Sequence, residues 1–238
     1  MTDEAKLLIE NYYLDAGLLK RWRRPFFKHH YASAVASAAN FLVAERPKGR
    51  TRILDLGCGY GTQALLFAAL GAKVIALDGD RTALDVARQR KAMYESAIGR
   101  HFEITFVEAN ALTFDYRQLE PIDGVHSMFA FNMMQPSSVV WTALCAALGP
   151  EARVAILDGN RDSWIGHLRM RRSAWSPREF ALALDKARFA TRLHRGAIAL
   201  PPLCWTVLPE GAGVWLDSKL RRGWFWPVSH QILAERIA

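Results

Sequence analysis

The sequence predicts an α/β protein in which a mostly parallel β-sheet carries helices on both faces. Short apolar runs alternate with helix-like segments between residues 52 and 157, and this alternation is typical of β-α-β units. The runs are almost wholly apolar, as expected for strands that are covered on both sides. With 238 residues, the chain has room for one full hydrophobic core, whereas two domains would each be small.

Local patterns predict the first elements in order. Strands are expected at residues 52–56, 73–77, 103–107, 122–128 and 153–157. Helices are expected between them at residues 62–70, 82–96 and 137–148, with a weak one at 116–119. Apolar residues at helical spacing predict two earlier helices at 4–21 and 28–45. We therefore expect an N-terminal helical cap over residues 1–48 and a main domain over residues 49–238.

Fewer signals mark the last third of the chain. A capping serine followed by a proline predicts a helix at residues 176–187. Residues 189–200 and 226–236 are expected as two further strands, which brings the sheet to seven. The cluster of proline and glycine at 209–213 predicts a break.

Three alternating glycines, Gly57, Gly59 and Gly61, follow the first expected strand. Glycine lets a chain turn sharply and lets a ligand approach the backbone. A loop at this place, ahead of a helix N-terminus, is typical of nucleotide sites. Its G-x-G-x-G spacing differs from the G-x-G-x-x-G that places a dinucleotide's pyrophosphate on the helix. Asp55 would repel a pyrophosphate but could engage an ammonium, so the charge pattern favours S-adenosylmethionine (SAM) over a nicotinamide dinucleotide.

A second carboxylate, Asp78, ends the second expected strand and is followed by Gly79. A carboxylate at this place can accept both hydroxyls of an adenosine ribose. Residues 55–61 with Asp78, 17 residues after Gly61, resemble the signature of class I SAM-dependent methyltransferases. The resemblance implies a Rossmann-like sheet of seven strands with the last one antiparallel. It also implies that the glycine loop, Cys58 included, holds the methionine part of SAM.

The resemblance continues at the end of the third expected strand. Asn110 and Ala111 stand where the family often has an aspartate and an alanine that contact adenine. Asparagine keeps the hydrogen-bonding reach and loses the charge. We add Phe129, which follows the fourth expected strand, to the expected cofactor contacts.

The acceptor side of the site is less readable. The family places it above strands four and five, under the N-terminal helices and the segment after strand five. We select His167, in the segment after strand five, and His30, in the N-terminal helices, as candidate general bases, because imidazole titrates near neutral pH. Met133 and Met134 offer an apolar wall for a greasy or planar acceptor, although core packing is the interpretation that we favour for them. No metal site is expected, since the three cysteines lack metal-ligand spacing.

Net charge bears on partners. The chain carries +8, divided into +4 over residues 1–50, −3 over 51–158 and +7 over 159–238. Basic flanks favour an anionic partner, and tryptophans interleaved with arginines near the C-terminus can stack bases or sit at a lipid interface. No RNA-binding module is visible in the sequence, and we expect neither a transmembrane segment nor a secretory leader. We therefore expect a cytoplasmic protein, with peripheral membrane contact left open and the oligomeric state undetermined.

These observations favour a methyltransferase that acts on a small molecule, either lipid-like or a specialised metabolite. An RNA or protein methyltransferase that uses the basic flanks is the first alternative. A non-catalytic SAM-binding protein and a nicotinamide-dependent reductase are the others.

Overall fold

The strands of the structure, a computed structural model, form one seven-stranded sheet in the order β3-β2-β1-β4-β5-β7-β6. The structure describes residues 32–44, 46, 51–119, 121–164, 166, 175–200, 204, 207–222 and 227–237. The strands are β1 (Arg52–Leu56), β2 (Lys73–Asp78), β3 (Ile104–Glu108), β4 (Ile122–Met128), β5 (Leu148–Gly159), β6 (Phe189–Ile198) and β7 (Ser229–Arg236). Only β7 runs antiparallel to its neighbours, β5 and β6, among the described strands.

Strand order creates a crevice at the centre of the sheet. The chain moves outward from β1 through β2 to β3 and then returns to place β4 on the other side of β1. Loops that leave the carboxyl ends of β1 and β4 therefore depart in opposite directions. In open α/β sheets, ligands bind at this kind of switch point.

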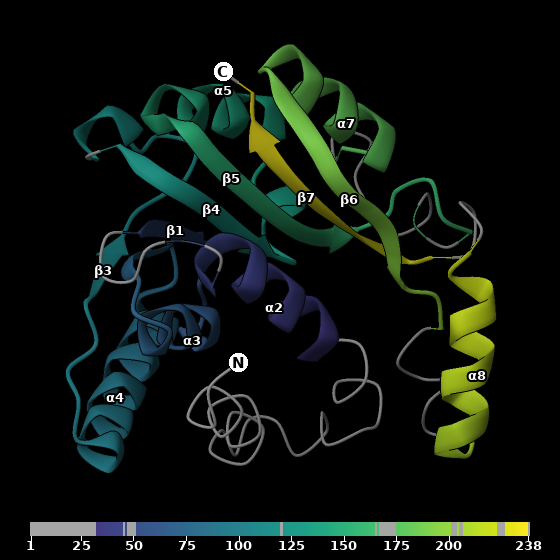
Figure 1. Cartoon of the computed structure of the whole chain (residues 1–238), viewed down its shortest axis with the longest axis horizontal. Helices are drawn as coiled ribbons and strands as arrows, with labels where there is room; N and C mark the ends of the chain where they lie inside the picture. The colour runs from purple at the N-terminus through teal and green to yellow at the C-terminus, as the bar shows by residue number, and fades with distance from the viewer. Residues whose placement is uncertain are drawn as a thin grey trace.

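Helices cover both faces of the sheet, with α5 and α7 on one side and α2, α3 and α4 on the other (Figure 1). The described helices are α2 (Ala32–Ala39), α3 (Thr62–Ala69), α4 (Arg81–Ile98), α5 (Ser137–Ala147), α7 (Pro177–Lys186) and α8 (Glu210–Leu220). Short turns of helix are η3 (Asn40–Ala44), η4 (Tyr116–Gln118) and η5 (Phe131–Met133). Among these described helices, none is both long and apolar enough to cross a membrane.

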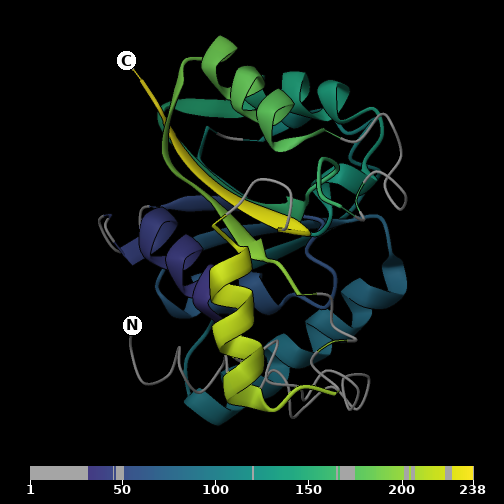
Figure 2. The ribbon, with the colours of Figure 1, turned by 90° about the vertical axis from the view of Figure 1, so that its right-hand side faces the viewer.

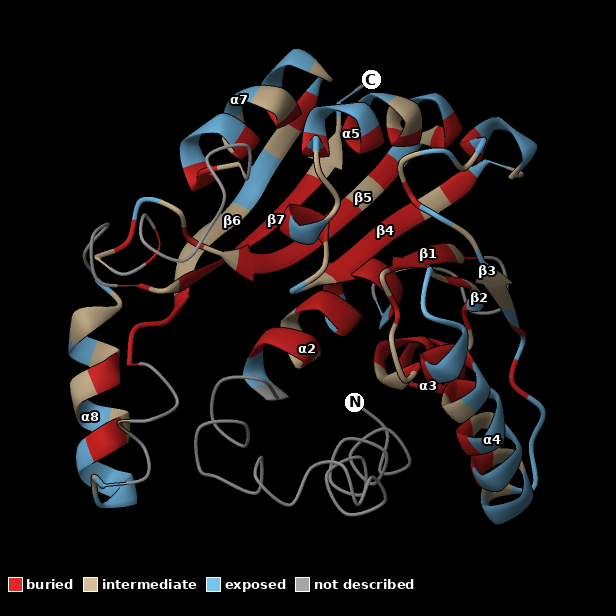
Figure 3. Cartoon of the chain, turned by 180° about the vertical axis from the view of Figure 1, so that it is seen from behind, coloured by how far each residue is buried: buried red, intermediate tan, exposed pale blue. Residues whose placement is uncertain are grey.

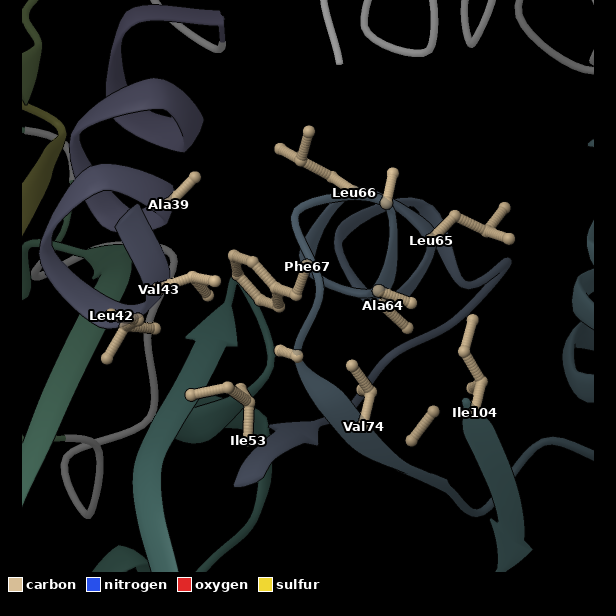
Figure 4. Packing of buried hydrophobic residues seen from close by; sticks show 14 of the residues in the cluster. Ala39, Leu42, Val43, Ile53, Ala64, Leu65, Leu66, Phe67, Val74 and Ile104 are labelled. Atoms are coloured by element: carbon tan, nitrogen blue, oxygen red, sulfur yellow. The ribbon is translucent and has the colours of Figure 1, made fainter. Parts of the chain in front are cut away.

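The core lies between the sheet and its two helical layers. Figure 3 shows β4, β5 and β7 as almost continuously buried, while the outer sides of α5 and α7 are exposed. On the other face, fully buried Phe67 of α3 extends toward Val43 and Leu42, above Ile53 of β1 (Figure 4). Strands with both faces buried have the near-continuous apolar character that the sequence displays.

The predicted fold class is confirmed: a Rossmann-like, mostly parallel seven-stranded sheet with helices on both faces. The capped start of α7 is confirmed as well, because Ser176 accepts the N–H of Glu179 and Glu179 accepts that of Ser176. The expected helix at 4–21 lies outside the described residues. The domain boundary at residues 48 and 49 stays a prediction.

One expectation was wrong. The cluster at 209–213 is not a break, because Pro209 caps helix α8, which continues to Leu220. This helix stands apart from α5 and α7, at the edge where β6 ends (Figures 1 and 2). Fully buried Asp217 anchors it by accepting the backbone N–H groups of Ala199 and Leu200, each at 2.8 Å.

Candidate active site

The glycine loop after β1 has the left-handed backbone that glycine permits. The φ angles of Gly57 and Gly61 are +72° and +73°, values that cost other residues about 1–2 kcal/mol. A Cβ on Gly57 would lie 2.3 Å from the Cβ of Ala130, which belongs to the loop after β4. Gly57 therefore keeps the loop after β1 in close contact with the loop after β4.

Contacts from neighbouring elements fix the loop. The N–H groups of Gly57 and Cys58 donate to the carbonyl of Leu77, at 2.8 and 3.1 Å. From α4, the buried Arg90 guanidinium donates to the carbonyl of Tyr60 at 2.6 Å. Strand β2 and helix α4 thus hold the loop in one conformation before any ligand arrives.

Asp78 lies at the tip of β2, next to the glycine loop. Its Oδ2 accepts the N–H of Gly59 at 2.7 Å, and its Oδ1 accepts the N–H of Asp80 at 2.9 Å. Each carboxylate oxygen has a second lone pair. The half-buried carboxylate is therefore oriented by the backbone and still able to accept hydroxyl groups.

The turn after β3 presents Asn110. Its Oδ1 accepts the N–H of Leu112 at 3.0 Å, which closes a local turn, and Asn110 itself is exposed. Ala111 is buried directly beneath it. The amide NH₂ of Asn110 keeps its donors for a ligand in the crevice.

The loop after β4 forms the opposite, apolar wall. Phe129 has a φ of +54°, which is uncommon for a residue with a side chain, and it is 41% exposed. Met133 is 79% exposed, so the expectation that it belongs to the core was wrong. Met134 both packs on the core and lines the crevice.

These elements enclose a cavity of about 760 Å³ at the carboxyl ends of β1–β4. Six of the expected cofactor residues line it: Gly57, Asp78, Gly79, Asn110, Ala111 and Phe129. The other lining residues are Leu77, Glu108, Ala109, Leu112, Met128, Ala130, Met133 and Met134. Sequence reasoning missed most of this second group, although its members directly neighbour the residues that were found.

Four expected cofactor residues lie behind the cavity, outside its lining. Gly59 and Gly61 shape the loop, and buried Cys58 lies under it. Burial raises the pKa of the Cys58 thiol, so this cysteine stays protonated.

Asp55, the fourth of these residues, is also buried, and it pairs with a histidine that sequence reasoning did not select. Its Oδ1 lies 2.8 Å from Nδ1 of His126 on β4, and both side chains are at most 3% exposed. The ring of Phe67 meets His126 edge-on. Oδ2 of Asp55 has no hydrogen-bond partner among the described residues, which leaves one buried oxygen beneath the glycine loop.

Asp158 and Asn132 hold the apolar wall against β5. Asp158, at the end of β5, accepts the N–H of Asn132 at 2.8 Å and the N–H of Gly159 at 2.7 Å. Burial raises the pKa of Asp158 to about 6. The side-chain amide of Asn132 in turn bonds both backbone groups of Trp175, at 3.0 and 3.1 Å. One asparagine thus connects the wall to the segment before α7.

The two candidate bases, His167 and His30, lie outside the described residues. Within the described lining of the cavity, the titratable groups are Asp78 and Glu108, and neither a histidine nor a cysteine is present. The base assignments therefore stay predictions.

Comparison with known protein sequences gives matches over part of the chain. A family profile described as a methyltransferase domain matches residues 53–158. A ubiquinone biosynthesis O-methyltransferase from Methylocella silvestris is 40% identical over 176 residues, which cover 66% of this chain and 65% of that protein. A cypemycin N-terminal methyltransferase from a Streptomyces species is 31% identical over 83 residues, 35% of this chain and 31% of that protein. The chain thus spans less than two thirds of the length of these curated relatives.

Solved structures share the whole fold. The crystal structure of magnesium protoporphyrin IX methyltransferase from Synechocystis PCC 6803, with bound SAM, has a TM-score of 0.60. The two chains are 14% identical, and the match covers 100% of this chain and 99% of that one. At this level of identity, the likeness establishes the architecture.

Proposed function

We propose that this chain is a class I SAM-dependent methyltransferase, because a methyltransferase-domain profile matches residues 53–158, and that it methylates a small-molecule acceptor. The profile match supports the resemblance that the glycine loop and Asp78 carry. The observation that carries the proposal is the cavity of about 760 Å³ between the glycine loop and the wall of Phe129, Met133 and Met134. Its volume falls within the roughly 300–1,000 Å³ of small-molecule sites.

The residues present fit SAM. Gly57 lines the cavity without a side chain, which suits the close approach of a ligand to the backbone. Asp78 offers oriented acceptor lone pairs for the ribose hydroxyls, and Asn110 offers amide donors for adenine. The unpaired oxygen of Asp55 adds negative charge beneath the loop, which supports binding of a cation and disfavours a pyrophosphate.

The residues of the chain then act by positioning. SAM, when bound, would supply an electrophilic methyl group: the acceptor's nucleophile would bond the methyl carbon as the carbon–sulfur bond breaks and the neutral thioether leaves. Asp78 and the glycine loop would fix the cofactor's position, while Phe129 and Met133 would exclude water and align an acceptor over it. Because the described lining offers no imidazole, we propose that any proton is taken by His167 or His30, or that the acceptor arrives already nucleophilic.

An apolar wall favours a planar or greasy acceptor. Exposed Phe129 and Met133 supply such a wall at the mouth of the cavity.

Three free cysteines support a reducing, cytoplasmic location for the reaction.

The substitution Asp78→Asn tests the cofactor site. The introduced amide would turn one acceptor into a donor that faces a backbone N–H, so SAM affinity should fall by about tenfold or more. Asp80→Asn is the matched control, since it removes the same charge two residues away. Asp80 caps α4 through the N–H groups of Thr82 and Ala83, and asparagine caps equally well. Calorimetry with SAM measures both; equal affinities in the two variants would remove Asp78 from the site.

An RNA or protein acceptor is the second candidate, favoured by one surface. On α8, exposed Trp215 shares a helical face with exposed Lys219, four residues later. Exposed Arg222 follows in the turn after the helix. Methyl-labelled SAM incubated with fractionated extract separates the candidates, because the label would appear in metabolite, RNA or protein. Recovery of SAM unchanged with every fraction, despite binding, would instead support a non-catalytic SAM-binding protein.

A further inference from the structure

A second cavity, of about 270 Å³, lies farther along the same edge of the sheet. We name it the arginine–histidine pocket after its lining residues Arg195, Arg221, Arg222, His194 and His230. Asn160, directly after β5, completes its polar lining. The pocket is too small for a cofactor and large enough for one functional group of a ligand.

Cations dominate the charge of the residues that line this pocket. Its lining contains three arginines and no carboxylate. Arg221 is ion-paired at 2.9 Å with Asp217, which lies behind it on α8. Arg195 bonds the neutral side chains of Gln231 and Ser37, and Arg222 has no ion pair with any described residue. Two guanidinium charges therefore remain uncompensated beside the pocket.

Buried His230 supplies a polar group without a protein partner. It is 4% exposed and lines the pocket, and its Nδ1 has no hydrogen-bond partner in the described part of the chain. Its ring centroid lies 5.7 Å from that of His194. Burial lowers the pKa of both histidines, and for His230 the value falls to about 3. A buried donor or acceptor without a partner costs free energy, and an anion that accepts a hydrogen bond there would remove this cost.

The arginine–histidine pocket lies within reach of the cofactor cavity. Met128 of β4, which lines the cofactor cavity, pairs with Leu157 of β5, and the next residue, Asp158, pairs with His230 of β7. The two sites are thus nearly level along the sheet and two strand spacings apart, about 10 Å. A small molecule can span this distance.

We propose that the arginine–histidine pocket binds an oxyanion of the acceptor, a carboxylate or a phosphate, while the acceptor's reacting end lies over the cofactor cavity. This inference rests on the proposed function and specifies it: the substrate class is an anionic small molecule with an apolar or planar part. Arg222, in the turn after α8, supplies charge, and His194 and His230 supply hydrogen bonds.

Two simple anions, inorganic phosphate and acetate, serve as probes. Either should shift the imidazole NMR signals of His194 and His230 in a saturable way, and the anion that binds more tightly identifies the group. Arg222→Gln should weaken this binding at least about fivefold, since a charge-assisted hydrogen bond is lost. Lys219→Gln is the control, because it removes the same charge three residues earlier, at an exposed residue of α8 outside the pocket lining.

Each outcome decides a separate point. Absence of any shift of the two imidazole signals, or equal weakening in the two variants, would overturn the inference. SAM affinity measured on the same samples keeps the proposals apart. Binding of SAM without the anion refutes the pocket alone, whereas binding of the anion without SAM refutes the methyltransferase proposal and leaves an oxyanion site.

Discussion

Replacing Gly57 by alanine measures how strongly the glycine loop and the apolar wall depend on each other. Gly57 has a φ of +72°, and its Cβ would lie 2.3 Å from that of Ala130. Gly99, at the end of α4, has a φ of +69° and nothing within 4 Å of the added Cβ. Both substitutions carry a left-handed cost of about 1–2 kcal/mol. Only Gly57→Ala adds an overlap, of about 1–3 kcal/mol.

The free energy of unfolding should therefore fall by about 1–2 kcal/mol in Gly99→Ala and by about 2–5 kcal/mol in Gly57→Ala. Denaturant titration measures both values. Calorimetry with SAM should give unchanged affinity for Gly99→Ala. For Gly57→Ala we expect the loop after β4 to move away from the cavity and to lose contacts with SAM. A loss of about 1.4 kcal/mol of binding free energy weakens SAM affinity about tenfold.

A double variant isolates the overlap from the backbone strain. Ala130→Gly removes the atom that the new Cβ would meet, so Gly57→Ala/Ala130→Gly should recover the overlap part of the lost stability, about 1–3 kcal/mol, together with SAM affinity, while the left-handed cost of about 1–2 kcal/mol remains. Ala130→Gly alone supplies the fourth corner of the cycle. A double variant no better than Gly57→Ala would refute the assignment of the loss to this contact.

Three further predictions concern the rest of the fold. Because the pKa of His230 is lowered from 6.5 to about 3, the unfolded chain binds a proton before the folded chain does, and stability falls as pH drops through this interval. Between about pH 8 and pH 5 the free energy of unfolding of the wild type should fall by about 2 kcal/mol more than that of His230→Leu. The raised pKa of Asp158 acts in the opposite direction in both proteins and cancels in this difference. Parallel pH profiles of the two proteins would contradict the lowered pKa of His230. Ser176→Ala should cost about 1 kcal/mol through loss of the α7 cap, measured by urea titration with Ser218→Ala on α8 as control. Asp217→Ala leaves two buried N–H groups and Arg221 without their carboxylate partner, so the free energy of unfolding should fall by about 3 kcal/mol or more. A smaller fall than in Ser176→Ala would contradict the anchoring role of Asp217.

The sheet was predictable because its signals are local. The bounds of β1 and β4 agree residue by residue with the apolar runs at 52–56 and 122–128. The glycine loop was readable for the same reason, since the residues that turn the chain and the strand before it are contiguous. Five strands and the cofactor side of the crevice follow from such patterns.

Helix α8 was not predictable because long-range contacts stabilise it. Gly211 and Gly213 lower its intrinsic helix propensity, and together with Pro209 they are typical of a turn. Asp217 compensates by bonding the chain after β6, 17 and 18 residues away in sequence. Tertiary anchoring of this kind leaves no periodic signal.

Asp55 illustrates the same limit within the site. Its position at the end of the first strand predicted a ligand contact, and that role stays a prediction. Its observed partner, His126, is 71 residues away in sequence. Only the pairing of β1 with β4, in which Asp55 lies opposite His126, makes that partner identifiable.

The two cavities differ in how the chain encodes them, and this difference explains why the cofactor is readable and the acceptor is not. The cofactor cavity takes its polar groups from successive turns after β1, β2 and β3, so each signal lies within a few residues. The arginine–histidine pocket joins four segments through Asn160, His194, Arg222 and His230. They meet because the last strand inserts antiparallel between β5 and β6. Acceptor specificity placed there can therefore change by substitutions on β6 or just after α8 without disturbing the contiguous stretch proposed to bind the cofactor.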